Sequence, residues 1–170
     1  MNYKEQYINR MWQAIKEVDI KGSFPSVIIA QGALESSWGQ SYLATQYNNY
    51  FGITKGSTWN GKIVQIGAYN YRVYDSIEAS LQDRISVLSK SYPMALAATT
   101  PYEEILAIKS GGWAEATNYV STLNNIIEQN NLTQFDNLIQ NTMKATTTYS
   151  IFLIFGVLIA GFALYKLLNK

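Results

Sequence analysis

The chain of 170 residues contains neither histidine nor cysteine, and its 13 Lys and Arg nearly balance its 12 Asp and Glu. These absences exclude Ser-His-Asp and Cys-His catalysis, disulfide bonds, and metal sites that need imidazole or thiolate ligands. Any catalysis must therefore use carboxylates, Tyr, Lys, amides or the backbone. The near-zero net charge and the motifs indicate no nucleic-acid-binding surface, and we expect no cofactor or metal.

The first two predicted elements are helices. Residues 3–20 place apolar side chains at three- and four-residue spacing, which predicts an amphipathic helix closed by Lys21-Gly22. Pro25 suits the first position of the second helix, which continues through the apolar residues 27–30 and is expected to end before Gly39. No basic, apolar and cleavage-site pattern opens the chain, so we expect no secretory signal peptide.

One carboxylate, Glu35, stands in the last turn of this second helix among Ala, Leu, Ile and Val. Burial disfavours the charged form of a carboxyl group and so raises its pKa. A carboxylic acid that stays protonated near neutral pH can give a proton to a glycosidic oxygen. Glu35 is thus a candidate general acid; the alternative is that it is the first solvated residue after a core helix.

The segment around Glu35 resembles a known signature. Residues 26–39 read SVIIAQGALESSWG and are similar to the "PSV-x-x-AQ-x-x-LES-x-WG" motif of bacterial glucosaminidases of the flagellar-hydrolase and autolysin type. These proteins are peptidoglycan hydrolases with a lysozyme-like fold. The resemblance implies that Glu35 is the catalytic acid and that Gln31 and Trp38 bind substrate.

A second segment, residues 48–54, resembles the "NN-x-FGIK" element that forms one wall of the sugar cleft in this family. The resemblance implies that Asn49 hydrogen-bonds an acetamido group and that Phe51 offers its ring to a pyranose. The alternative is an Asn-rich turn that leads into a strand.

Residues 59–74 predict a small antiparallel sheet with turns at Asn60-Gly61 and at Gly67. Many relatives carry a second acid in this hairpin, often as "T-x-E", whereas this chain has Gln65 and tyrosines near the expected place, and Gln65 is the substrate-binding candidate there. No Asp or Glu occurs from residue 36 to residue 74, so the segment is expected to be cationic and to attract carboxylates of peptidoglycan stem peptides.

The missing second acid leaves the mechanism open, because ordinary inverting and retaining glycosidases need two carboxylates. One route is assistance by the substrate's own 2-acetamido group. The other is attack by a muramic 6-hydroxyl, which gives an anhydro product and defines a lytic transglycosylase. Glu115, Asp75 and Glu78 are further acids available for recruitment by the fold, and nothing in the sequence selects among them.

Three more helices follow. Asp75 is expected to cap the first, with Glu78 as its partner, and Pro93 and Pro101 open the next two. Residues 112–119 then resemble the family's "GYATD-x-x-Y" segment. That resemblance implies that Tyr119 positions the sugar or the acid near Glu35 and that Trp113 contacts substrate; the alternative for Tyr119 is the packing face of the following helix.

The end of the chain has a different character. Residues 145–165 carry no charge, as expected of a segment that crosses a bilayer, and Lys166 and Lys170 follow. We predict a polar linker at 141–148 and a transmembrane helix at 149–168. An anchored enzyme without a signal peptide has no evident route of export from a host cell. We therefore expect it in a phage virion with an internal membrane or a membrane-linked vertex. Its expected protein partners are those of the membrane or virion.

The sequence therefore predicts a mainly α (α+β), lysozyme-like domain over residues 1–140 with a small β-hairpin lobe, followed by one transmembrane helix. The predicted activity is cleavage of β-1,4 bonds between GlcNAc and MurNAc in peptidoglycan, with Glu35 as general acid. A lytic transglycosylase and a catalytically silent wall-binding or virion structural module are the alternatives. The expected partners are glycan strands and a lipid bilayer, and no nucleic acid.

Overall fold

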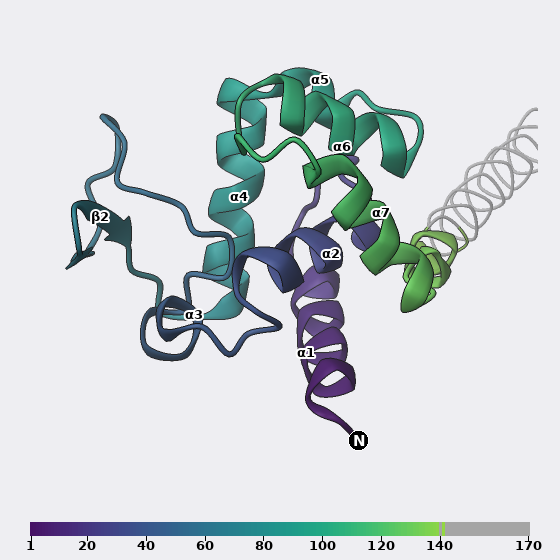
Figure 1. The fold of residues 1–170 in the computed structure, drawn as a ribbon, viewed down its shortest axis with the longest axis horizontal. Helices are drawn as coiled ribbons and strands as arrows, with labels where there is room; N and C mark the ends of the chain where they lie inside the picture. The colour runs from purple at the N-terminus through teal and green to yellow at the C-terminus, as the bar shows by residue number, and fades with distance from the viewer. Residues whose placement is uncertain (140, 142–170) are drawn as a thin grey trace, which may run out of the picture. The chain divides into compact units, whose positions relative to one another are not determined.

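The computed structural model describes residues 1–139 and 141. Its first compact unit is Met1–Phe135. The elements run in the order α1 (Tyr3–Glu17), α2 (Pro25–Glu35), α3 (Tyr42–Tyr47), β1 (Ile63–Ile66), β2 (Tyr69–Arg72), α4 (Ile77–Ser91), α5 (Pro93–Leu96), α6 (Pro101–Ser110) and α7 (Tyr119–Gln129), as Figure 1 shows.

The predicted transmembrane helix, and the predicted linker apart from residue 141, lie outside the described residues. Within the described part of the chain, no helix has the length and apolar character that a membrane span requires. The anchor therefore stays a prediction.

Helix α2 forms the centre of the unit. Nine of its 11 residues, Pro25–Ala33, are buried, because a helix that is apolar on every side is stable only inside a core. It packs against α1, α6 and α7. Pro25 occupies the first turn as predicted, so the sequence reading of this helix is confirmed at its start.

Helices α1 and α2 approach closely at Gly32. The Tyr7 hydroxyl donates to the carbonyl oxygen of Ile29 at 3.0 Å, and a Cβ at position 32 would lie 2.4 Å from that hydroxyl oxygen. Glycine is therefore required here by space. Helix α1 ends at Glu17 rather than at residue 20, because Val18 is extended and the Asp19 side chain accepts from the Lys21 N–H at 3.0 Å.

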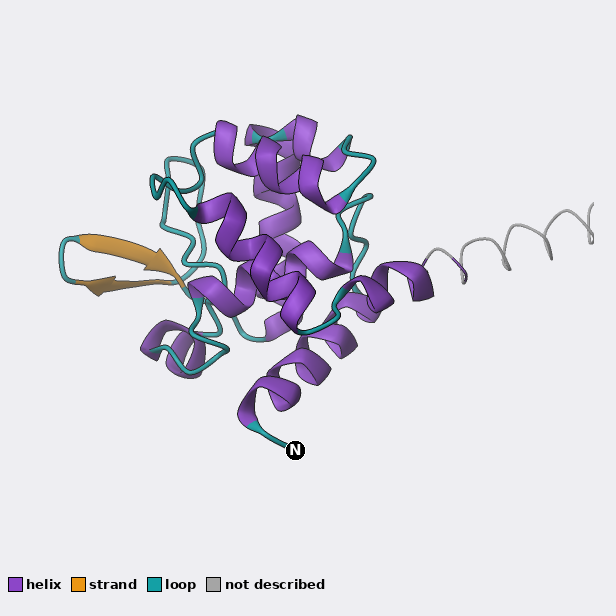
Figure 2. Cartoon of the chain, turned by 45° about the vertical axis from the view of Figure 1, so that its right-hand side comes forward, coloured by secondary structure: helices purple, strands orange, loops and turns teal. Residues whose placement is uncertain are grey.

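Strands β1 and β2 form an antiparallel hairpin with Ile63 opposite Arg72 and Ile66 opposite Tyr69. The hairpin projects from the helical body (Figure 2). Residues 59–62, which the sequence predicts to join the sheet with a turn at Asn60-Gly61, form no strand. Trp59 Nε1 donates to the Lys62 carbonyl at 3.0 Å. A single bridge from Thr54 to Tyr71 adds to the hairpin instead.

Helix α4 begins one residue later than predicted. Ser76, not Asp75, is its N-cap, and the Ser76 side chain accepts from the Ala79 N–H at 3.2 Å. Asp75 instead lies 3.4 Å from Lys62 Nζ on the surface.

The predicted start of α6 is confirmed, with Thr100 accepting from the Glu103 N–H at 3.2 Å.

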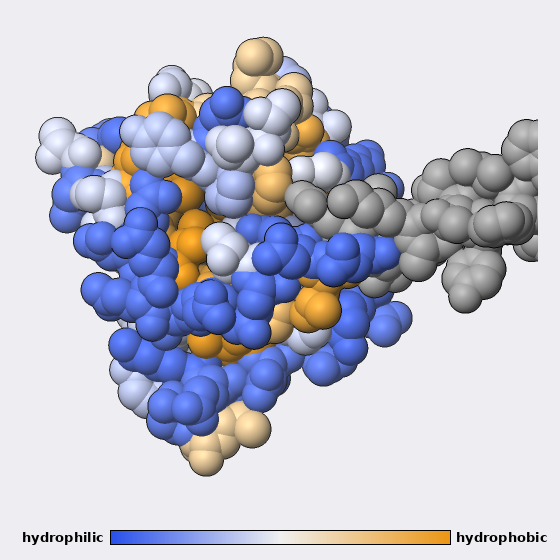
Figure 3. All heavy atoms as spheres, turned by 90° about the vertical axis from the view of Figure 1, so that its right-hand side faces the viewer, coloured by the Kyte–Doolittle hydropathy of each residue, from blue (hydrophilic) through white to orange (hydrophobic). Residues whose placement is uncertain are grey.

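The face in Figure 3 is mostly hydrophilic, with hydrophobic residues in small patches between polar ones. The expected mainly helical fold with a small hairpin is confirmed.

Candidate active site

Glu35 is the last residue of α2, and a tight turn places it there. Ser37, Trp38 and Gly39 all adopt left-handed backbone angles, with φ of 51°, 59° and 75°. The Ser36 hydroxyl donates to the Gly32 carbonyl and accepts from the Gly39 N–H at 2.7 Å. The helix therefore ends at Glu35, so Glu35 lies in its last turn and the helix ends before Gly39, as predicted.

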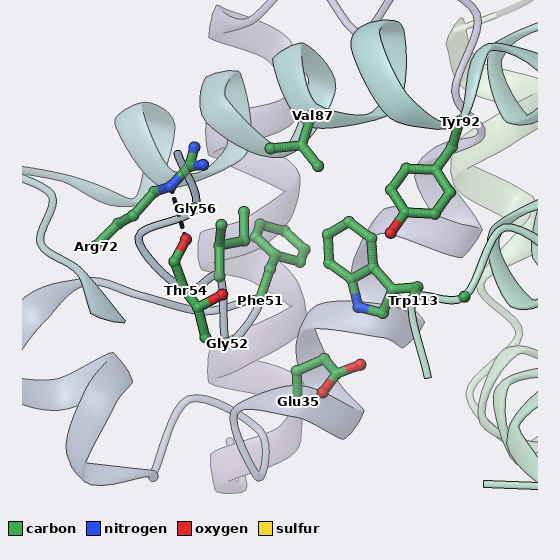
Figure 4. A pocket seen from close by; sticks show the side chains of 11 residues that line it. Glu35, Phe51, Gly52, Thr54, Gly56, Arg72, Val87, Tyr92 and Trp113 are labelled. Atoms are coloured by element: carbon green, nitrogen blue, oxygen red, sulfur yellow. Dashed lines mark hydrogen bonds between the residues drawn. The ribbon is translucent and has the colours of Figure 1, made fainter. Parts of the chain in front are cut away.

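Glu35 lines a cavity of about 390 Å³. Figure 4 shows Glu35, Phe51 and Trp113 around one space, with Val87 and Tyr92 on its other side. Among the lining residues, all within the described part of the chain, Glu35 is the only carboxylate. The full lining is Glu35, Phe51, Gly52, Ile53, Thr54, Gly56, Arg72, Val87, Tyr92, Gly112 and Trp113.

The surroundings of Glu35 are those of a proton donor. Burial raises its pKa above the ordinary value of 4.5, and hydrogen bonds from the Tyr119 and Trp113 side chains lower it by a smaller amount. The Tyr119 hydroxyl lies 3.3 Å from Glu35 Oε1. The carboxyl group thus keeps its proton to higher pH than a solvated glutamate does. Tyr119 and Trp113 can donate hydrogen bonds that stabilise the carboxylate once the proton has left.

Gln31 does not line the cavity. It is fully buried, and its Nε2 donates to the Tyr119 hydroxyl oxygen at 3.0 Å. Its Oε1 accepts from Arg84 Nε at 2.7 Å. Gln31 therefore contacts the partner of the acid, and the predicted contact between Gln31 and substrate has no place in this geometry.

Asn49 has a similar supporting position beside Phe51. Its Nδ2 donates to the carbonyls of Ile53 and Arg72, both at 2.9 Å, and its Oδ1 accepts from the Ile53 N–H at 3.0 Å. The amide is buried and fully used within the protein. It holds the loop that brings Phe51 to the cavity wall.

Trp38 and Gln65 are not among the residues that line the cavity. The Trp38 ring packs edge-on against Tyr7, with centroids 5.8 Å apart, and Lys4 Nζ lies 4.8 Å from its ring. Gln65 is exposed on β1 and its Nε2 donates to the Gly67 carbonyl at 3.4 Å. The substrate roles of both residues stay predictions.

Several residues of the site are not found by sequence reasoning. Arg72 lines the cavity, but its Nη1 lies 3.0 and 2.8 Å from the two carboxylate oxygens of Asp83, so its charge is paired. Lys62 is likewise paired with Asp75. Residues 36–74 contain no acids, but these two cations of the segment are paired with acids that follow it in the sequence.

Arg84 and Glu104 are also missed, and they form an ion pair with 3.1 Å between Nη2 and Oε1 and both side chains fully buried. The available signal is the place of Arg84 in α4, at helical spacing from the apolar residues Leu81 and Leu88. An arginine inside an apolar stripe needs a buried partner.

No group of three acidic side chains gathers closely enough to hold a metal ion among the residues that the structure describes. The chemistry that this arrangement supports is proton transfer from one half-buried carboxyl group into an aromatic-walled cavity.

Comparison with known proteins adds a family. Residues 11–132 match the glucosaminidase family model, described as mannosyl-glycoprotein endo-beta-N-acetylglucosaminidase. A probable N-acetylmuramidase of Lactococcus lactis subsp. cremoris is 36% identical over 157 residues, which cover 79% of this chain and 36% of the relative. The chain thus spans about a third of the length of such curated relatives.

Two solved structures share the fold. The catalytic domain of the autolysin Auto from Listeria monocytogenes superposes with a TM-score of 0.65 at 30% identity, covering 80% of this chain and 89% of that one. A peptidoglycan hydrolase from Sphingomonas sp. A1 gives a TM-score of 0.66 at 29% identity, covering 76% and 91%.

Proposed function

The chain belongs to the glucosaminidase family, and from this premise we propose that it cleaves β-1,4 bonds of the peptidoglycan glycan backbone with Glu35 as general acid. The observation that carries the proposal is the position of Glu35. Among the described residues it is the single carboxylate that lines this aromatic-walled cavity, and burial raises its pKa. The similar Sphingomonas protein is itself named a peptidoglycan hydrolase.

The chemistry follows from the geometry. Glu35 gives its proton to the glycosidic oxygen while the bond from that oxygen to the sugar C1 breaks through an oxocarbenium-like transition state. The departing proton leaves a carboxylate, and the donors Tyr119 and Trp113 stabilise that new charge. Trp113, which is half-buried, supplies a ring surface on which a pyranose can pack. Phe51 is only 1% exposed and lines the cavity wall as part of the core, so its predicted contact with a pyranose is not supported.

Within the part of the chain that the structure describes, the cavity lining holds no second carboxylate, which supports a nucleophile that belongs to the substrate. The 2-acetamido oxygen can attack C1, after which water opens the ring that forms. Alternatively the 6-hydroxyl of a muramic residue attacks C1, giving its proton to the Glu35 carboxylate and leaving a 1,6-anhydro end. The second route makes the protein a lytic transglycosylase, which is the runner-up function.

The test is to digest purified peptidoglycan with the full-length chain and read the new ends by mass spectrometry after borohydride reduction. Reduced GlcNAc ends identify a glucosaminidase, and reduced MurNAc ends a muramidase, the activity named for the Lactococcus relative. Anhydromuramyl ends, which borohydride does not reduce, identify a transglycosylase. No new ends from a folded protein would contradict the enzyme proposal and favour a binding or structural module.

We also keep the anchor as a proposal, because residues 145–165 carry no charge. A chain expressed in bacteria should remain with membranes after extraction at alkaline pH, and the chain truncated after residue 144 should be released. A place in a virion is tested by probing purified particles for the protein.

A further inference from the structure

A chain of hydrogen-bonded buried side chains, none of which lines the cavity, leads to Glu35. Arg84 Nε donates to Gln31 Oε1 at 2.7 Å, and Gln31 Nε2 donates to the Tyr119 hydroxyl oxygen at 3.0 Å. That oxygen lies 3.3 Å from Glu35 Oε1. Arg84 and Gln31 are fully buried and Tyr119 nearly so. We name Arg84, Gln31 and Tyr119 the donor relay.

The chemistry of arginine sets the direction of the whole relay. A guanidinium has only donors and stays charged at any working pH. Gln31 must therefore turn its carbonyl oxygen to Arg84 and its NH₂ group to Tyr119, so the amide has one allowed orientation. The Tyr119 oxygen accepts from Gln31, and its single O–H is left to point at Glu35.

We infer that Arg84 and Gln31 are positioning residues for the general acid, and that the donor relay holds the transferable proton of Glu35 on Oε2. Oε1 accepts from Tyr119, so a proton on the carboxyl group belongs on the other oxygen. A Cβ at Gly52, which lines the cavity, would lie 3.9 Å from Oε2. This inference rests on the proposed function.

The relay has a rigid base. Arg84 also donates to the Ser23 hydroxyl at 2.9 Å and to Glu104 Oε1 at 3.1 Å. Glu104 in turn accepts from the Phe24 N–H at 2.7 Å, at the start of α2. Because Nε, Nη1 and Nη2 of Arg84 all donate to buried acceptors, the guanidinium has little freedom to turn away from Gln31.

The groups that influence Glu35 come from several elements. Tyr119 of α7 and Trp113 of the preceding loop donate to it. Arg72 of β2 and Tyr92, which follows α4, line the same cavity. The charge of Arg72 is paired with Asp83. The polar contacts to Glu35 are therefore those from Tyr119 and Trp113, and of these two a change at position 31 acts directly on the contact from Tyr119.

The test is Gln31→Glu in the full-length chain, kept in solution with a mild detergent. The new carboxylate keeps the shape but accepts from both neighbours, so the Tyr119 O–H turns from Glu35 toward residue 31. Glu35 then loses a donor and gains a nearby negative charge, and its pKa should rise by about one unit or more. Carbon-13 NMR of labelled glutamate carboxyls measures this, with the Glu35 signal identified by its absence in Glu35→Gln.

A second background separates donation from charge. In Tyr119→Phe there is no O–H to redirect, so Gln31→Glu acts on Glu35 through its charge alone. The pKa shift should therefore be larger with Tyr119 present than with Phe by about half a unit or more. Equal shifts in the two backgrounds would overturn the relay. Gln82→Glu, an exposed change on α4, is the matched control and should leave the Glu35 pKa unmoved.

Tyr119→Phe alone keeps the test decisive if Gln31→Glu does not fold. This change removes the Tyr119 hydroxyl, the member of the donor relay that contacts Glu35, and should raise the pKa of Glu35. An unchanged pKa would contradict the inference. The NMR measurement needs no turnover, so it tests the relay even if the protein does not cut peptidoglycan. In an active protein, the alkaline limb of kcat/KM should move upward with the pKa, and kcat should fall more than KM changes.

Discussion

The hydroxyl oxygen of Tyr119 lies 3.3 Å from Glu35 Oε1, although 84 positions separate the two residues in the sequence. The contact joins the end of α2 to the start of α7. It places a neutral donor beside a half-buried carboxyl group, where a donor adds stability to the anion without adding charge.

Tyr119→Phe is expected to lower kcat by about ten- to hundredfold, because a hydrogen bond to a charged group contributes about 1.5–3 kcal/mol. The loss should be mainly in kcat, since the bond stabilises the carboxylate that forms as the proton leaves. Steady-state kinetics on soluble peptidoglycan fragments measure it. An unchanged kcat with a raised KM would instead make Tyr119 a substrate contact.

Glu35→Gln is expected to stabilise the fold at neutral pH. Burial raises the folded-state pKa of Glu35 above the ordinary 4.5, so the folded state binds a proton more tightly than the unfolded state. The wild-type free energy of unfolding therefore falls as pH rises from about 4.5 through the raised pKa. Urea denaturation should show the variant equal to wild type below pH 4 and more stable at pH 7. A difference that does not depend on pH would contradict this.

The buried pair of Arg84 and Glu104 predicts an asymmetric pattern of stability. Arg84→Met leaves a buried carboxylate without its cation and should cost about 3–5 kcal/mol. Replacing both residues, Arg84→Met with Glu104→Leu, should recover most of this loss. Urea denaturation of the single and double variants measures both values. A double variant as unstable as Arg84→Met would show that the cost does not come from the unpaired charge.

Asn49 is expected to act through the fold rather than through the sugar. Asn49→Ala removes the side-chain donor to the Arg72 carbonyl, the acceptor of the Ile53 N–H and one of two donors to the Ile53 carbonyl, which also accepts from the Arg72 N–H. The change should cost about 2–3 kcal/mol. Asn49→Asp should cost at least as much, because it sets a carboxylate against two carbonyls. If either variant raised KM with no loss of stability, a direct contact with an acetamido group would be the better explanation.

Local patterns predicted much of this architecture. Pro25 and the apolar run that follows it identify α2, and Pro101 identifies the start of α6. The start of α4 was misplaced because Asp75 and Ser76 are both good N-cap residues. The Asp75 side chain instead lies on the surface, 3.4 Å from Lys62 Nζ.

The resemblance to a family, rather than local patterns, predicted part of the site. Glu35, Phe51 and Trp113 come together at the cavity, and Tyr119 meets Glu35. The roles of Gln31 and Asn49 depend on geometry, since an amide serves equally well for a sugar, a backbone carbonyl or an arginine. The pairing of Arg84 with Glu104 spans 20 positions, and no local pattern specifies it.

The most direct test of the central claim compares Glu35→Gln with wild type in the release of fragments from purified peptidoglycan. Glu128→Gln, an exposed change on α7, is the matched control. Gln keeps the shape of Glu35 but has no acidic proton to give. The account predicts a loss of about 10²–10⁴-fold in rate for Glu35→Gln and none beyond about twofold for Glu128→Gln. A folded Glu35→Gln protein with wild-type activity would contradict the assignment of Glu35 as the general acid.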